Sequence, residues 1–236
     1  MNKITYAINQ NGELIYVDNV PNGSECHCVC PGCHEKMVAK NKGKIRMHHF
    51  AHISGTECVN GYETMKHLLA KEIITETRLI PWIDRNRYTP IPSVRMIKET
   101  EHTINNIKII PDITARIQTN RNLTLPFFIE IYVTHKTDEE KLSLIKSAGI
   151  PAIEIDLSKS NAQTKEELIN DIYNPQNLKI LNATIGKQFI PQIQVIQQYF
   201  APRLLQSYAG RFTTRNHRSP YKSNRLYKKY HYSRKR

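Results

Sequence analysis

The chain has 236 residues, 39% of them hydrophobic, and a formal net charge of +13, enough length for one large domain or two smaller ones. It has no run of about 18 apolar residues, which excludes a conventional membrane-spanning helix, and its first residues lack a secretory signal pattern, so we expect a cytoplasmic protein. The five cysteines are odd in number and clustered between Cys26 and Cys58, which indicates metal binding rather than a disulfide framework.

The excess positive charge is confined to the C-terminal part of the chain. Residues 1–171 contain 21 Lys and Arg against 21 Asp and Glu, whereas residues 172–236 contain 13 basic residues and no acidic ones. A neutral body with a cationic tail predicts a tethered contact with a polyanion rather than a uniformly basic surface.

The sequence predicts three consecutive parts. Residues 4–8 and 14–17 are apolar and flank a turn-forming Asn-Gln-Asn-Gly stretch, which indicates a hairpin. This hairpin opens a zinc-finger-like β module over residues 1–60. An α/β domain is predicted over 61–175, followed by a basic, aromatic-rich tail over 176–236.

Two pairs of metal-ligand residues follow the hairpin. Cys30 and Cys33 are separated by two residues, as are His49 and His52. A cysteine pair on a turn, with a histidine pair on a turn or in the first turn of a helix, completes the tetrahedral nitrogen and sulfur set that zinc favours. We therefore predict a zinc site formed by these four residues, the alternative being unliganded thiols and histidines on a loop. Substitute ligands in the same block are Cys26, Cys28, His34, His48 and Cys58.

The order of the two pairs bears on the role of the zinc. A zinc deaminase places a His-x-Glu element before its cysteine pair. Here the histidines follow the cysteines, and neither His49 nor His52 is followed by Glu two residues later. We therefore interpret the zinc as structural.

A helix is predicted next, because apolar residues recur at helical spacing between Tyr62 and Ile74. Glu63, His67 and Lys71 lie four residues apart and therefore share one edge of this helix. Taken alone, such a row is typical of a solvent-exposed face.

Two single carboxylates lie at or within apolar, strand-like runs. Asp112 follows Pro111 in a predicted strand over 107–117, and Glu130 lies inside the run 127–133. Burying a charge there is costly unless something pairs with it, and a divalent cation is the simplest partner that requires two acids. The alternatives are a turn residue for Asp112 and a solvent-facing strand residue for Glu130.

The run that contains Glu130 opens a strand, helix, strand sequence. Residues 138–146 begin with acids and end with Lys, as the helix dipole prefers. A helix of this length brings residues 153–157 alongside 127–133 in parallel, which predicts an α/β fold. By alternation, we interpret Glu154 and Asp156 as a polar strand face.

Taken in order, the Cys-x-x-Cys pair, His-Phe-Ala-His, a Glu-x-x-x-His helix, Pro-Asp and Ile-Glu-Ile resemble the competence protein CoiA-like family over residues 1–160. The resemblance implies the PD-(D/E)XK nuclease superfamily, with a restriction-endonuclease-like mixed sheet and flanking helices. It implies a magnesium-dependent nuclease that hydrolyses DNA phosphodiester bonds. The family name suggests DNA uptake, whereas phage defence or mobile-element processing fits equally well.

The resemblance also implies roles for single residues. Glu63 matches the helical acid before the sheet, and Asp112 and Glu130 match the ligands of a catalytic Mg²⁺ or Mn²⁺. The superfamily's usual Lys two residues after the strand acid is replaced by Tyr132, and Lys141 is our first candidate for the missing charge. Other candidates for this charge, or for handling a proton, are His67, Lys71 and His135. If none of them acts, the chain is a zinc-containing DNA-binding or DNA-processing factor without cleavage, or an assembly adaptor that works through its tail.

The tail interleaves cations with aromatic residues. Arg and Lys neutralise phosphates while rings stack on exposed bases, a combination suited to single-stranded or branched nucleic acid, most simply DNA. Beyond about residue 210 the tail has no apolar periodicity, which predicts disorder in the unbound state; the alternative is a solubilising tail. The predicted nucleic-acid-binding residues are Arg211, Arg215, Arg218, Lys222, Arg225, Lys228 and Lys229.

Overall fold

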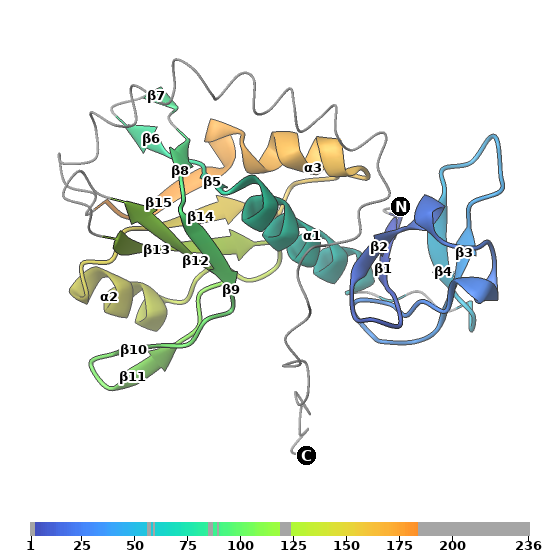
Figure 1. Cartoon of the computed structure of the whole chain (residues 1–236), viewed down its shortest axis with the longest axis horizontal. Helices are drawn as coiled ribbons and strands as arrows, with labels where there is room; N and C mark the ends of the chain where they lie inside the picture. The colour runs from blue at the N-terminus through green and yellow to red at the C-terminus, as the bar shows by residue number, and fades with distance from the viewer. Residues whose placement is uncertain are drawn as a thin grey trace.

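The computed structural model of the chain describes residues 3–55, 58, 60–84, 87–88, 90–118 and 124–183. They form a small β-rich module at the N-terminus and a larger α/β unit built on a mixed sheet (Figure 1). The tail residues predicted to bind nucleic acid lie outside the described part of the chain. No helix in that part is long and apolar enough to cross a bilayer.

The N-terminal module consists of two antiparallel strand pairs. These are β1 (Tyr6–Ile8) with β2 (Leu14–Tyr16), and β3 (Met37–Lys40) with β4 (His49–His52). The first pair is the hairpin that the sequence predicted. Isolated bridges from Ile4 to Phe50 and from Ile8 to Val29 join the pairs, and two short 3-10 helices, η1 (Val17–Asn19) and η2 (Ser24–Cys26), complete the connections. Buried apolar side chains from all of these segments form the module's own core.

The larger unit is organised around a five-stranded sheet in the order β15-β14-β13-β12-β9. Its strands are β9 (Arg95–Lys98), β12 (Ile113–Gln118), β13 (Thr124–Tyr132), β14 (Ala152–Asp156) and β15 (Leu178–Asn182). Strand β13 runs parallel to β14, and the other neighbours are antiparallel. Helix α2 (Glu139–Ser147) connects β13 to β14, so the predicted strand, helix, strand order is confirmed.

Alternation along β13 gives the sheet two different faces. Phe127, Ile129 and Ile131 belong to the core that includes residues of α1 (Gly61–Thr77) and α3 (Lys165–Ile172). Phe128, which alternates with them, packs with residues of α2 and the hairpin of β10 (His102–Ile104) and β11 (Ile107–Ile109). Glu130 therefore lies on the α2 face of the sheet.

The remaining described elements cover the connection between α1 and β9. They are the antiparallel pairs β5 (Leu79–Ile80) with β8 (Ile91–Pro92) and β6 (Ile83–Asp84) with β7 (Arg87–Tyr88). Helix α1 ends at Thr77 and is capped by Arg78, whose backbone is left-handed at φ 54°. A 3-10 turn, η3 (Pro175–Asn177), precedes β15. Because β15 pairs with β14, the sheet extends past residue 175, where the sequence predicted the tail to begin.

The strand predicted over residues 107–117 is two strands in the structure. Asn105 and Asn106 both have positive φ, 50° and 63°, and form the turn between β10 and β11. Pro111, which lacks a backbone donor, lies between the end of β11 and the start of β12. This break places Asp112 at the entry of β12, beside the C-terminal end of β13.

Candidate functional site

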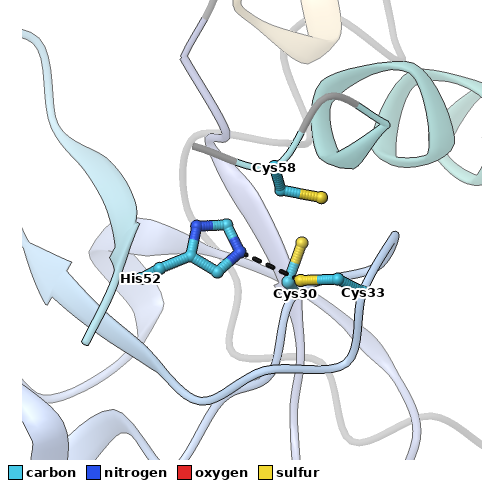
Figure 2. Close-up of side chains that lie close together, drawn as sticks. All are labelled: Cys30, Cys33, His52 and Cys58. Carbon is cyan, nitrogen blue, oxygen red and sulfur yellow. Dashed lines mark hydrogen bonds between the residues drawn. The ribbon is translucent and has the colours of Figure 1, made fainter. Parts of the chain in front are cut away.

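The first candidate site is a cluster of three thiols and one imidazole (Figure 2). The ligand atoms of Cys30, Cys33, His52 and Cys58 all lie within 4.8 Å of one another, and Cys33 Sγ is 3.2 Å from His52 Nε2. Three sulfur atoms and one imidazole nitrogen are the donor set of a structural zinc site. Burial raises the pKa of Cys30 to about 12, so its thiolate form depends on a bound cation. The cluster therefore fits zinc.

The backbone of the cluster packs against the first residue of α1. A Cβ atom on Gly32 would lie 3.0 Å from the backbone of Asn60 and Gly61. A Cβ atom on Gly61 would lie 2.7 Å from Ile4 Cδ1, 3.0 Å from Cys30 Sγ and 3.3 Å from Cys58 Sγ. Both glycines therefore allow close approach, and the metal cluster adjoins the helix that carries Glu63 and His67.

His49 is not part of the cluster, which corrects the predicted ligand set. The prediction placed both histidines on a turn or in the first turn of a helix, whereas residues 49–52 form strand β4. Residues three apart on a strand point to opposite faces, so His49 and His52 cannot face the same ion. His49 Nδ1 lies 2.9 Å from the carbonyl oxygen of Met47. Cys58, one of the substitute ligands, takes its place.

The other substitute ligands of the block have different surroundings. Cys26 and Cys28 are buried in the module core, where their thiols donate to the carbonyl oxygens of Met37 and Cys26 at 3.3 and 3.1 Å. His34 has a left-handed backbone at φ 61°, and His48 contacts Asp18. None of these four belongs to the described metal cluster.

The second candidate site is a pocket of about 630 Å³. Segments that meet there are the N-terminal half of α1, the entry of β12, the end of β13, the loop after β13 and the start of α2. All six residues predicted to be catalytic line this pocket: Glu63, His67, Asp112, Glu130, His135 and Lys141. The fold therefore brings together side chains that are up to 78 positions apart in the sequence.

Asp112 is the most heavily bonded acid of the pocket. Its Oδ1 lies 2.8 Å from Lys71 Nζ, while Oδ2 accepts hydrogen bonds from the backbone N–H of Ile131 at 2.8 Å and from His67 Nε2 at 3.2 Å. Burial by itself would raise the pKa of Asp112, but His67 and Lys71 hold it well below its usual range. Asp112 is therefore a carboxylate at all ordinary pH values.

Lys71 connects this acid to a residue that the sequence analysis did not identify. The side chain of Lys71 is only 5% exposed, and its ammonium also lies 2.8 Å from Glu99 Oε1. Glu99 follows β9 with a left-handed backbone at φ 50°. The solvent-exposed interpretation of the Glu63, His67 and Lys71 row is therefore wrong for Lys71, whose burial requires the two carboxylates.

Glu130 forms an ion pair with Lys141, the residue ranked first for the missing charge. Glu130 is 6% exposed, and its Oε1 lies 2.8 Å from Lys141 Nζ, which also donates to the carbonyl oxygen of Ile110 at 2.9 Å. Burial raises the pKa of Glu130 to about 7, with a further contribution from Asp112, while Lys141 opposes the shift. Asp138 accepts a hydrogen bond from the Lys141 backbone N–H at 2.7 Å, which caps α2 and positions this lysine.

Glu154 also lines the pocket, although the sequence analysis assigned it to a polar strand face. It is 2% exposed and pairs in register with Glu130 across the parallel strands. Its carboxylate accepts a hydrogen bond from the Thr137 backbone N–H at 2.8 Å and lies 3.3 Å from Lys179 Nζ. The shared alternation of the two Ile-Glu-Ile runs is the signal that could have placed it beside Glu130.

The zinc assignment predicts which substitutions remove the metal. We expect one zinc per chain in the purified wild type, and because Cys58→Ser and His52→Ala each delete a ligand, these variants should lose most of it. His49→Ala is the matched control and should retain it. Elemental analysis measures the metal content. Zinc loss in His49→Ala together with retention in Cys58→Ser would contradict the cluster.

The raised pKa of Glu130 predicts a pH dependence of stability. Its folded-state pKa of about 7 exceeds the ordinary 4.5, so the folded protein binds this proton more tightly than the unfolded chain. Between these values the free energy of unfolding therefore falls as pH rises. Glu130→Gln should therefore gain stability relative to the wild type as the pH rises from about 4.5 to 7, by up to about 3 kcal/mol.

Urea unfolding across this pH range measures that difference. The control is Glu139→Gln, an exposed acid at the start of α2, which should follow the wild type in parallel at every pH. A Glu130→Gln curve that also runs parallel to the wild type would show that Glu130 titrates normally.

In comparisons with known proteins, one family model matches part of the chain. Residues 20–61 match the model described as the N-terminal domain of competence protein CoiA. No curated protein and no solved structure matches the chain. The matched segment contains all four residues of the metal cluster and ends at the first residue of α1. The match thus supports the resemblance to CoiA-like proteins, through the module that holds the metal cluster.

Proposed function

We propose that this protein is a metal-dependent nuclease that hydrolyses DNA phosphodiester bonds and carries a structural zinc. The observation that carries the proposal is the meeting of Asp112, Glu130 and Lys141 in one pocket. The two acids come from neighbouring strands, and the lysine comes from the helix that follows them. Sequence distance alone gives no reason for these three residues to converge.

The order of elements around the pocket supports a restriction-endonuclease-like fold. Helix α1 is followed by β9, β12 and β13, in which β12 pairs antiparallel with both β9 and β13, and then by the crossover helix α2 and the strand β14, which runs parallel to β13. This is the arrangement that the resemblance to CoiA-like nucleases implies. The Pro-Asp motif stands at the entry of β12, and the strand acid lies opposite on β13.

Lys141 supports the proposal where the sequence departs from the superfamily pattern. Tyr132 occupies the usual Lys position, and the Lys136 ammonium lies 5.5 Å from the centre of its ring. Tyr132 is not among the pocket-lining residues, whereas Lys141 is. Its ammonium adjoins the strand acid, at the place where it can stabilise negative charge developing on a phosphate.

The remaining pocket residues have distinct roles in this proposal. Asp112 and Glu130 offer the carboxylate oxygens that Mg²⁺ and Mn²⁺ prefer, and such an ion, when bound, supplies an activated water and stabilises the scissile phosphate. His67 holds the carboxylate of Asp112 in place. Glu63, which lines the same pocket, supports the two metal ligands. The exposed His135 is placed to transfer a proton to or from solvent.

One observation favours the runner-up, a zinc-containing DNA-binding or DNA-processing factor that does not cleave. Both acids already have cationic partners within the chain, Asp112 with Lys71 and His67, and Glu130 with Lys141. These ion pairs satisfy the buried charges without any added cation. A pocket of this kind can persist as a structural network after activity is lost.

A cleavage assay separates the two functions. We expect the full-length protein with Mg²⁺ or Mn²⁺ to cut at least one of single-stranded, double-stranded or branched DNA, with RNA tested in parallel. Glu130→Gln and Asp112→Asn should lower the rate by about 100-fold or more, because each removes a charged ligand. Lys141→Met should lower it by a similar factor through lost charge stabilisation.

The matched control for Lys141 is Lys146→Met, which removes an exposed lysine from the last turn of the same helix and should leave the rate unchanged. Zinc content serves as the check that each variant folds. If the wild type cuts no substrate with either metal, or if Glu130→Gln cuts as fast as the wild type, the nuclease proposal is wrong.

The proposed role of the tail generates a separate prediction about binding. Replacing the seven predicted cations between Arg211 and Lys229 by Gln should weaken DNA affinity and flatten its dependence on salt, because fewer counterions are released. Fluorescence anisotropy at several salt concentrations measures both quantities. An unchanged salt slope would show that the tail is only a solubilising segment.

A further inference from the structure

A second concave surface lies in the N-terminal module, in the segment that matches the CoiA model. It is a groove of about 780 Å³ bordered by the strand pair β3 and β4, the loop between these strands and the N-terminal segment. Four cations line it, Lys3, Lys40, Lys42 and Arg46, and none of its lining residues is acidic. Figure 1 shows the β3–β4 loop on the side of the module away from the five-stranded sheet.

Hydrogen bonds within the module fix the shape of this groove. The Asn41 side chain donates to the carbonyl oxygens of Val17 and Val20 at 2.7 and 2.9 Å. Asn22 donates to the carbonyl oxygen of Ala39 and to Asn41 Oδ1, both at 2.9 Å. The groove is therefore built on hydrogen-bonded backbone of the folded module.

A histidine secures the loop that carries two of the cations. His48 Nδ1 lies 2.6 Å from Asp18 Oδ1, and its Nε2 lies 2.7 Å from the carbonyl oxygen of Gly43. Asp18, the acid that contacts this loop, is thus already paired with His48. Lys42 and Arg46 lie on either side of Gly43, whose carbonyl oxygen contacts His48. Neither cation has an acidic partner among the ion pairs of the described residues.

Apolar surface accompanies these cations. Val38, Ala39 and Met47 line the same groove. Met47 is 52% exposed, and Ile45, at the tip of the loop, is 98% exposed. Exposed apolar side chains beside unpaired cations have no function in the packing of the module itself.

We propose that this groove binds a single strand of nucleic acid. Each nucleotide combines a phosphate, which Lys40, Lys42 and Arg46 can neutralise, with a flat base that can rest on apolar side chains. A duplex hides its bases in the stack, and an acidic peptide carries charge without flat apolar faces, so neither matches both features. The inference extends the proposed nuclease function by naming a strand-holding site, yet strand binding requires no cleavage.

Charge reversal in the groove tests this site in the full-length protein. Lys42→Glu combined with Arg46→Glu should weaken binding of a fluorescent single-stranded DNA oligonucleotide by about 10-fold or more. For two lost phosphate contacts, the slope of log affinity against log salt should fall by about 1.4. Binding is measured without added Mg²⁺ or Mn²⁺, so cleavage does not contribute, and without chelator, so the zinc cluster is retained.

The matched control is Lys146→Glu combined with Lys159→Glu, two exposed lysines outside the groove that give the same change in net charge. It should weaken binding by no more than about 2-fold. Equal losses in both double variants would overturn the proposal, because the effect would then be one of net charge alone. Zinc content confirms that the reversed module is folded.

Two further measurements distinguish the occupant. Met47→Ser should weaken single-stranded DNA binding and leave duplex binding unchanged, since only unpaired bases reach the apolar surface of the groove. Poly-glutamate should bind weakly and show no sensitivity to the reversal. If poly-glutamate binds as tightly as DNA and depends equally on Lys42 and Arg46, the groove recognises an acidic polypeptide and the nucleic-acid proposal fails. If the wild-type protein binds single-stranded DNA through the groove but cuts no substrate, only the nuclease function is refuted.

Discussion

The burial of Asp112 is the constraint on which the pocket depends. A carboxylate at the entry of a sheet is stable only when its charge is compensated, and here the compensation comes from three groups on two elements. His67 and Lys71 reach it from α1, and the backbone N–H of Ile131 reaches it from β13. The same contacts that satisfy this one charge therefore fix the helix against the sheet and set the width of the pocket between them.

The sequence predicted most of what local pattern controls and less of what depends on tertiary partners. The N-terminal hairpin, the α1 segment and the β13-α2-β14 crossover follow from periodicity, capping and chain direction, and all are present. Glu99 and Glu154 were missed because their importance comes from neighbours distant in sequence. Glu99 is 28 positions from Lys71, and Glu154 joins Glu130 only through the register of two parallel strands.

The metal ligands show that the same sequence spacing can bring two side chains together or separate them, depending on the secondary structure. Two residues separate Cys30 from Cys33, and two separate His49 from His52. Only the cysteine pair, however, lies on a turn that lets both side chains face one point. The histidines lie on a strand, where the same spacing separates them. Reading His-Phe-Ala-His as a strand would have removed His49 from the ligand set, and Cys58 was the remaining thiol outside the module core.

The packing of the metal cluster on Gly61 limits how the chain can be divided. A boundary near residue 60 separates the β module from the α/β unit in sequence, but the first residue of α1 lies against Ile4 and the thiols of Cys30 and Cys58. Cutting the chain there would expose apolar surface beside the metal cluster in the β module and would leave the first turn of α1 uncovered in the α/β unit. The two parts thus differ in composition but pack against each other, and the matched segment that ends at residue 61 contains the whole metal cluster and, of the pocket-lining residues, only Asn60.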